Sequence, residues 1–126
     1  MNTFRTALAG AALIAALAAC SGGGAAASVT PPPDADLTIV AKDSKFDQAS
    51  ITATAGEGFQ LFFRNLDGLP HNVAIFTDAS ASKSLFVGET ITNAAVLYEV
   101  PALQPGEYFF RCDLHPDMKG TVVVAN

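Results

Sequence analysis

The sequence is poor in the side chains that bind metals or react with substrates. It contains two cysteines, two histidines and two methionines among 126 residues, and it has no tryptophan. At most one disulfide could form, and the histidine count excludes metal centres that need several imidazoles. Basic residues are also scarce, since 7 lysines and arginines stand against 12 acidic residues. Without a lysine or arginine cluster, the composition argues against binding to nucleic acid or to anionic lipid surfaces.

No apolar run is long enough to span a bilayer. The small and apolar run Ala7–Ala19 is shorter than the about 20 residues that a membrane helix needs, and it fits the apolar region of a secretory signal. It ends in "LAAC" (17–20), which resembles the lipobox of bacterial lipoproteins, in which the cysteine is lipidated. We predict a signal peptide over residues 1–19 and a lipid anchor at Cys20, and hence an exported protein on the periplasmic face of a membrane or the outer cell surface. The alternative is an ordinary signal peptide that leaves Cys20 free.

The segment after this cysteine is predicted to be a tether. Residues 20–35 are rich in glycine and alanine and then in proline, with no periodic apolar face, and the folded domain is predicted to cover residues 36–126. If Cys20 carries lipid, Cys112 has no disulfide partner. A lone exported thiol is open to oxidation unless it is buried or bound, so Cys112 requires an explanation.

From Asp36 onward the pattern is that of β-strands separated by turns such as Asp67-Gly68 and Pro105-Gly106. Strands are expected at 37–41, 50–55, 59–65, 72–76, 95–100, 107–112 and 121–125. Seven or more short strands in about 90 residues predict an all-β fold, an antiparallel β-sandwich with Greek-key connections. Alternation with period two predicts inward-pointing side chains, namely Phe59, Leu61, Phe63, Tyr108 and Phe110.

The scarce metal-binding side chains gather in two places that can meet at one pole of such a sandwich. Cys112, His115 and Met118 recur every third residue in one predicted loop, and His71 begins a predicted strand. Singly, each has an ordinary structural explanation, but their spacing favours a metal site. The set lacks the oxygen ligands of Mg²⁺ and Ca²⁺, and a thioether contributes little to structural zinc. Two histidines and a cysteine with a weak axial methionine are typical of blue copper.

Two segments carry a family resemblance. "LPHNVAIF" (69–76) and "PGEYFFRCDLHPDMKGTVVV" (105–124) resemble the ligand segments of the cupredoxins, the family of plastocyanin, azurin and amicyanin. The resemblance implies a cupredoxin-like sandwich that holds one type 1 copper ion. It implies three equatorial ligands and one axial ligand: His71, Cys112 and His115, with Met118 in the axial position.

Two further residues are expected to support these ligands. Asn72 matches a family position whose side chain ties the two ligand loops together, and ligands need such support to keep their orientation. Asp113 stands where the family often has serine or threonine. We expect its carboxylate to take over the hydrogen bond that braces the loop and to lower the reduction potential.

The cupredoxin resemblance implies a carrier of single electrons between a redox protein donor and a redox protein acceptor. We expect it to be a monomer, and the lipobox adds a membrane tether. The alternative is copper binding and delivery, which usually needs more exposed methionines and histidines than this chain has. A third possibility is a metal-free structural sandwich. An enzyme is not expected, because copper oxidases need further histidines, and a Cys112–His115 nucleophilic pair would lack a recognisable orienting group.

Overall fold

The part of the chain that the structure describes is built from β-strands. The computed structural model describes residues 29–126, so the predicted signal peptide and Cys20 lie outside these residues. No helix in this described part is long and apolar enough to cross a membrane. The strands are Leu37–Lys42 (β1), Lys45–Phe46 (β2), Ser50–Thr54 (β3), Phe59–Asn65 (β4), Ala74–Phe76 (β5), Ser84–Val87 (β6), Ala95–Val100 (β7), Gly106–Arg111 (β8) and Lys119–Ala125 (β9).

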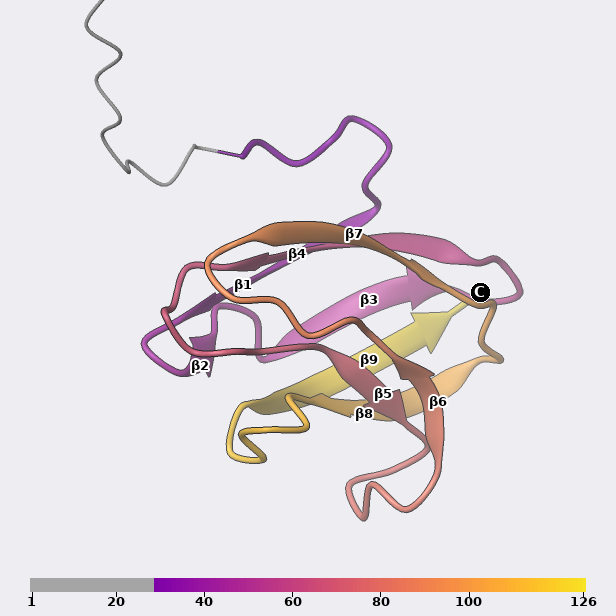
Figure 1. Cartoon of the computed structure of the whole chain (residues 1–126). Coiled ribbons are helices and arrows are strands. Elements are labelled where there is room, and N and C mark those ends of the chain that lie inside the picture. The colour runs from indigo at the N-terminus through magenta and orange to yellow at the C-terminus, as the bar shows by residue number, and fades with distance from the viewer. Residues whose placement is uncertain (1–28) are drawn as a thin grey trace, which may run out of the picture.

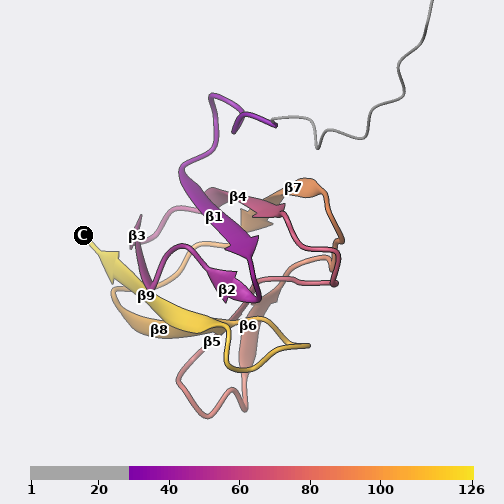
Figure 2. The same ribbon diagram turned by 90° about the vertical axis from the view of Figure 1, so that its left-hand side faces the viewer.

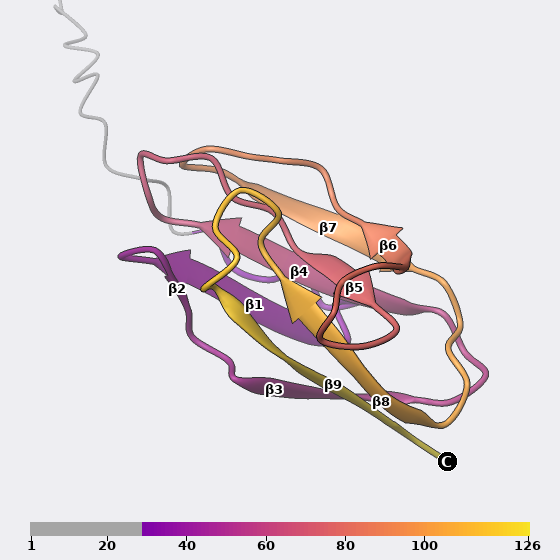
Figure 3. The ribbon, with the colours of Figure 1, turned by 90° about the horizontal axis from the view of Figure 1, so that it is seen from below.

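These strands form two sheets that pack face to face (Figure 1). One sheet has the order β2-β1-β4-β7, and the other has the order β3-β9-β8-β5-β6. Figure 3, seen from below, shows the five-stranded sheet in front of the four-stranded one. The predicted all-β Greek-key sandwich is therefore confirmed. The expectation of purely antiparallel pairing was wrong, because β1 pairs parallel with β4 and β3 pairs parallel with β9.

The parallel pairs arise where the chain leaves a sheet and later returns to it. The partners β1 and β4, and likewise β3 and β9, are neighbours in a sheet but not consecutive in sequence, and a long connection can bring them together in the same direction. The structure also contains two strands that the sequence did not predict. One is β2, only two residues long, and the other is the edge strand β6, whose burial does not alternate.

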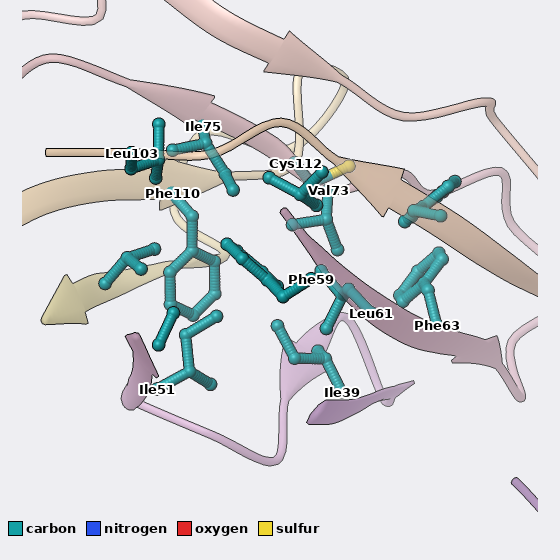
Figure 4. Packing of buried hydrophobic residues seen from close by; sticks show 14 of the residues in the cluster. Ile39, Ile51, Phe59, Leu61, Phe63, Val73, Ile75, Leu103, Phe110 and Cys112 are labelled. Atoms are coloured by element: carbon teal, nitrogen blue, oxygen red, sulfur yellow. The ribbon is translucent and has the colours of Figure 1, made fainter. Parts of the chain in front are cut away.

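The space between the sheets is filled by side chains that alternate along the strands (Figure 4). Four of the predicted core residues are at most 7% exposed: Phe59, Leu61, Phe63 and Phe110. Tyr108 is only half-buried and donates its hydroxyl to the carbonyl of Gln104. Full burial of one large apolar side chain contributes about 1.5–3 kcal/mol, so this core can stabilise the domain without a disulfide.

Several connections meet at one end of the sandwich, on the left in Figure 1 and facing the viewer in Figure 2. They join β1 to β2, β4 to β5, β6 to β7 and β8 to β9. Residues 66–73 and 112–118 belong to this end, so the topology brings the two predicted ligand segments to the same pole.

The residues just before β1 lie on the outer side of the four-stranded sheet (Figures 1 and 2). The N–H of Asp36 donates to the carbonyl of Gln60 (2.9 Å), and the Asp36 carboxylate accepts the N–H of Gln60 (2.7 Å). Farther upstream, the guanidinium of Arg64 donates to the carbonyl of Val29 (3.4 Å). The chain therefore contacts β4 before it enters β1, and it enters β1 at the end away from the ligand segments.

Candidate metal centre

The loop between β8 and β9 is closed by backbone hydrogen bonds between predicted ligands. The N–H of Cys112 donates to the carbonyl of Met118 (2.9 Å), which extends the β8–β9 pairing by one residue. The N–H of Met118 donates to the carbonyl of His115 (2.9 Å) and makes a tight turn inside the loop. Pro116 follows His115 and restricts the backbone there. These two hydrogen bonds span the loop and restrain its backbone.

His71 reaches the same place from the connection between β4 and β5. Its backbone forms an isolated bridge with Ile91, in which each N–H donates to the other's carbonyl at 3.0 Å. The expected strand start at Asn72 was therefore wrong, since β5 begins at Ala74 and His71 pairs with the β6–β7 connection instead. These two hydrogen bonds fix the backbone of His71 at the pole, and the residue is 0% exposed.

The nitrogen and sulfur atoms of the predicted equatorial ligands form a small triangle. Nδ1 of His71 lies 3.0 Å from Nδ1 of His115, and Sγ of Cys112 lies 3.7 Å from the first nitrogen and 3.8 Å from the second. A point equidistant from the three atoms lies about 2.0 Å from each, at the lower end of the roughly 2.0–2.3 Å range of metal bonds to nitrogen and sulfur. The triangle therefore has the right size to surround one transition-metal ion.

The triangle is largely closed to solvent. His71 and Cys112 are 0% exposed and Met118 is 3% exposed, and Met118 belongs to the same buried cluster as Cys112. His115 is half-buried and is the member of the triangle that reaches the surface. All four predicted ligands thus lie together, and burial of Cys112 also answers the question raised by a lone exported thiol.

Asn72 and Asp113 bind each other across the two ligand segments. The amide nitrogen of Asn72 donates to the Asp113 carboxylate (3.1 Å), and the backbone N–H of Asp113 donates to the amide oxygen of Asn72 (2.9 Å). The same amide nitrogen also donates to the carbonyl of Gly88 (3.1 Å). Because Asn72 follows His71 and Asp113 follows Cys112, these bonds fix the distance between the two ligand segments.

The far side of the His71 ring contacts an acidic residue that the sequence analysis treated only as part of a turn. Nε2 of His71 lies 2.9 Å from Oδ2 of Asp67. Burial alone would raise the pKa of the Asp67 carboxyl, but hydrogen bonds from Ser44, Asp43 and His71 outweigh it and leave that pKa below its ordinary value. Asp67 is therefore a carboxylate at neutral pH, oriented toward the ring.

A buried asparagine shapes the connection that carries both residues. Asn65 is 1% exposed, and its amide nitrogen donates to the carbonyls of Leu69 and Ile91, both at 2.7 Å. Its amide oxygen accepts the N–H of Asp67 (2.8 Å). Sequence reasoning missed Asn65 because a polar residue at a strand end has no distinctive pattern until its backbone partners are known.

The fold and donor set define a class of protein, a Greek-key sandwich with one soft metal site at its pole. A family model described as a cupredoxin-like domain matches residues 10–124. The chain belongs to this family, and the resemblance seen in the sequence is confirmed. Its cofactor is one type 1 copper ion, a group that the soft donor set and the size of the triangle fit.

Individual relatives agree with this assignment. Plastocyanin A/B from Petroselinum crispum is 33% identical over 85 residues, which cover 63% of this chain and 86% of that protein. Amicyanin from Paracoccus versutus is 32% identical over 91 residues, covering 71% of this chain and 66% of that protein.

Solved structures give the same fold. The crystal structure of the Paracoccus versutus amicyanin matches with a TM-score of 0.58 at 30% identity, covering 79% of this chain and 88% of that one. Auracyanin from Roseiflexus castenholzii matches with a TM-score of 0.64 at 18% identity, covering 71% of this chain and 96% of that one. The second match shows similarity of fold alone.

Proposed function

We propose that this protein is an exported blue copper protein that carries single electrons between a redox protein donor and a redox protein acceptor. The proposed equatorial ligands are His71, Cys112 and His115, and Met118 is the proposed axial ligand. The observation that supports the proposal most directly is the triangle of two imidazole nitrogens and one sulfur, with sides of 3.0, 3.7 and 3.8 Å. When bound, copper supplies a one-electron couple between Cu(II) and Cu(I).

The polypeptide contributes a geometry that is held independently of the oxidation state. The loop bonds at Cys112 and Met118, the Ile91 bridge at His71 and the Asn72–Asp113 pair restrain both ligand segments. A donor set of this kind is a compromise between the preferences of the two copper ions. Rigid ligands then need little rearrangement when the electron arrives or leaves, which favours fast transfer.

Electrons are proposed to pass through the edge of His115. This ring is half-buried at the surface of the pole, and Leu114 and Pro116 flank it in sequence. Of the large hydrophobic side chains that are exposed among residues 29–126, three lie in the pole segments 66–73 and 112–118: Leu66, Leu69 and Leu114, at 36%, 51% and 48% exposure. We call these three residues the leucine patch. A modest patch suffices, because transient redox contacts bury less than about 1,200 Å².

Electron self-exchange tests this function. A mixture of the Cu(I) and Cu(II) forms is expected to exchange electrons rapidly, measured as broadening of NMR lines, and to release copper only slowly to a competing chelator. Leu114→Glu is expected to slow the exchange without changing the visible spectrum, because a charge in the leucine patch opposes close contact between the two protein molecules. Val87→Glu is the matched control, since Val87 is 58% exposed but lies on β6.

The opposite pattern would support copper delivery. Slow self-exchange combined with rapid transfer of copper to an acceptor apoprotein would replace the electron-carrier proposal. Equal effects of Leu114→Glu and Val87→Glu on self-exchange would show that the leucine patch is not part of the proposed electron-transfer route. The carrier itself needs no substrate site, and we propose no enzymatic activity for it.

The membrane attachment is proposed to be a lipid on Cys20, with residues 1–19 removed as a signal peptide. Cys20→Ala is expected to move the protein from the membrane fraction to the soluble fraction of the exported compartment, because acyl chains contribute about 0.8 kcal/mol per buried CH₂. Fractionation followed by immunoblotting measures this change. Copper binding should be unaffected, since Cys20 precedes the described domain. Unchanged membrane attachment of the variant would exclude the lipobox interpretation.

A further inference from the structure

Asp67 joins two parts of the pole that are distant in sequence. Its Oδ1 accepts the backbone N–H of Asp43 (2.7 Å), and its Oδ2 accepts the backbone N–H of Ser44 (3.0 Å). The same Oδ2 lies 2.9 Å from Nε2 of His71. The Asp67 side chain is 13% exposed, and the His71 side chain is fully enclosed. One carboxylate therefore connects the β1–β2 turn to a proposed copper ligand.

The β1–β2 turn is shaped to hold this carboxylate. Asp43 and Ser44 form a two-residue hairpin loop, and both have left-handed backbone angles, with φ of 52° and 55°. This conformation is uncommon for residues with a side chain, and it turns two successive N–H groups toward one side. Both groups point at Asp67 rather than at solvent. The carboxylate is consequently fixed by bonds that do not involve His71.

We propose that Asp67 is a positioning residue for the copper site, which orients the His71 ring and lowers the reduction potential. This inference rests on the proposed function, because it requires His71 to be a copper ligand. A histidine that binds metal through Nδ1 carries its proton on Nε2, and that N–H must donate. Asp67 is the acceptor placed there, so it selects the tautomer that leaves Nδ1 free to face Cys112 and His115.

The carboxylate also changes the preference for oxidation state. A negative charge that accepts the Nε2 proton increases the electron donation of the imidazole through Nδ1. Stronger donation stabilises Cu(II) more than Cu(I), because the doubly charged ion gains more from each donor. Loss of the charge should therefore weaken Cu(II) binding selectively and raise the potential.

Two substitutions of Asp67 separate the effect of its charge from that of its hydrogen bonds. Asp67→Asn can keep one oxygen facing His71 and Ser44 but loses the charge, whereas Asp67→Ala loses both. Outer partners of metal ligands typically change metal affinity 10–100-fold. We expect Asp67→Asn to lower Cu(II) affinity about tenfold relative to Cu(I), which corresponds to a rise of about 59 mV for a one-electron couple. Asp67→Ala should show a larger rise.

Asp43→Asn is the matched control. It removes the same charge from the adjacent turn without removing a contact to His71, and asparagine tolerates the left-handed backbone that Asp43 adopts. Its potential should stay near that of the natural chain. If Asp67→Asn and Asp43→Asn shift the potential equally, the effect is that of a nearby charge and the positioning role is overturned.

A second measurement examines the hydrogen bond itself in the copper-loaded full chain. In the Cu(I) form, the His71 Nε2 proton is expected to give a slowly exchanging NMR signal, and Asp67→Ala should accelerate its exchange with solvent. An unchanged potential and unchanged proton exchange in Asp67→Ala, even with a lowered unfolding temperature, would make Asp67 a structural link only. If the natural chain binds no copper through His71, the proposed function itself is wrong. That outcome is seen in the natural chain without any Asp67 variant, so it is distinct from failure of the Asp67 proposal.

Discussion

Replacing Cys112 with alanine is expected to abolish the intense blue colour of the Cu(II)-loaded protein. Thiolate-to-Cu(II) charge transfer is the source of that colour, and Cys112 provides the sole thiol among the described residues. Its Sγ lies 3.7 and 3.8 Å from the two imidazole nitrogens, so its loss leaves an open side in the triangle. Cu(II) affinity should fall by more than the roughly 10–100-fold that loss of an outer partner costs. Visible absorption and electron paramagnetic resonance spectra measure both effects.

The variant should still fold, because it removes one buried sulfur atom, a change on the order of 1 kcal/mol. Circular dichroism of the copper-free protein checks this point. Met118→Leu provides the contrast within the same loop. It is expected to keep copper and the blue colour but to raise the potential, because a thioether stabilises Cu(II). A blue Cys112→Ala protein would refute the proposed ligand set, and an unchanged or lowered potential in Met118→Leu would count against the axial role.

The proposed ligands were predictable because their chemistry is local. The spacing of Cys112, His115 and Met118 fits one loop after one strand, and alternation along the predicted strand 107–112 directed Cys112 inward, where the structure buries it just after β8. His71 was harder to place, since its approach to the loop depends on topology. The Cys112 and His71 segments converge because β5 pairs with β8 in the same sheet.

The supporting residues were not predictable to the same extent. Asp67 precedes His71 by four residues and was assigned to a turn, because nothing local shows that the β1–β2 turn will direct two N–H groups at it. Asn65 and the short strand β2 are similar cases, since their roles follow from partners in other strands. Such contacts depend on the three-dimensional fold, and sequence periodicity carries no information about them.

The packing of the two strands that carry the ligand loop depends on a glycine. Gly120 of β9 lies opposite Phe110 of β8 in the strand register. A Cβ atom at position 120 would lie 2.4 and 2.5 Å from carbon atoms of the Phe110 ring and 2.6 Å from the carbonyl oxygen of Ala49. The Phe110 ring is 0% exposed and packs against Phe46 with ring centres 5.5 Å apart, so it has little room to move. Neither neighbour can yield without displacing the core or the backbone.

Gly120→Ala is therefore expected to lower the free energy of unfolding by about 2–3 kcal/mol, near the upper part of the usual range for overpacking. For a domain of about 100 residues this corresponds to a fall of roughly 10–20 °C in Tm, measured by thermal unfolding of the copper-free protein. Gly68→Ala is the control, because an added Cβ there meets no atom within 4 Å, and it should change the unfolding free energy by less than about 0.5 kcal/mol.

A double variant identifies the cause of the loss. Phe110→Leu should destabilise the domain by itself, but combined with Gly120→Ala it should cost less than the sum of the two, because the smaller side chain frees part of the space. The rescue should be partial, since the Ala49 carbonyl remains 2.6 Å from the added carbon. Strictly additive losses would contradict the steric account. Copper binding should weaken together with stability, because β8 and β9 also hold the two ends of the loop at Cys112 and Met118.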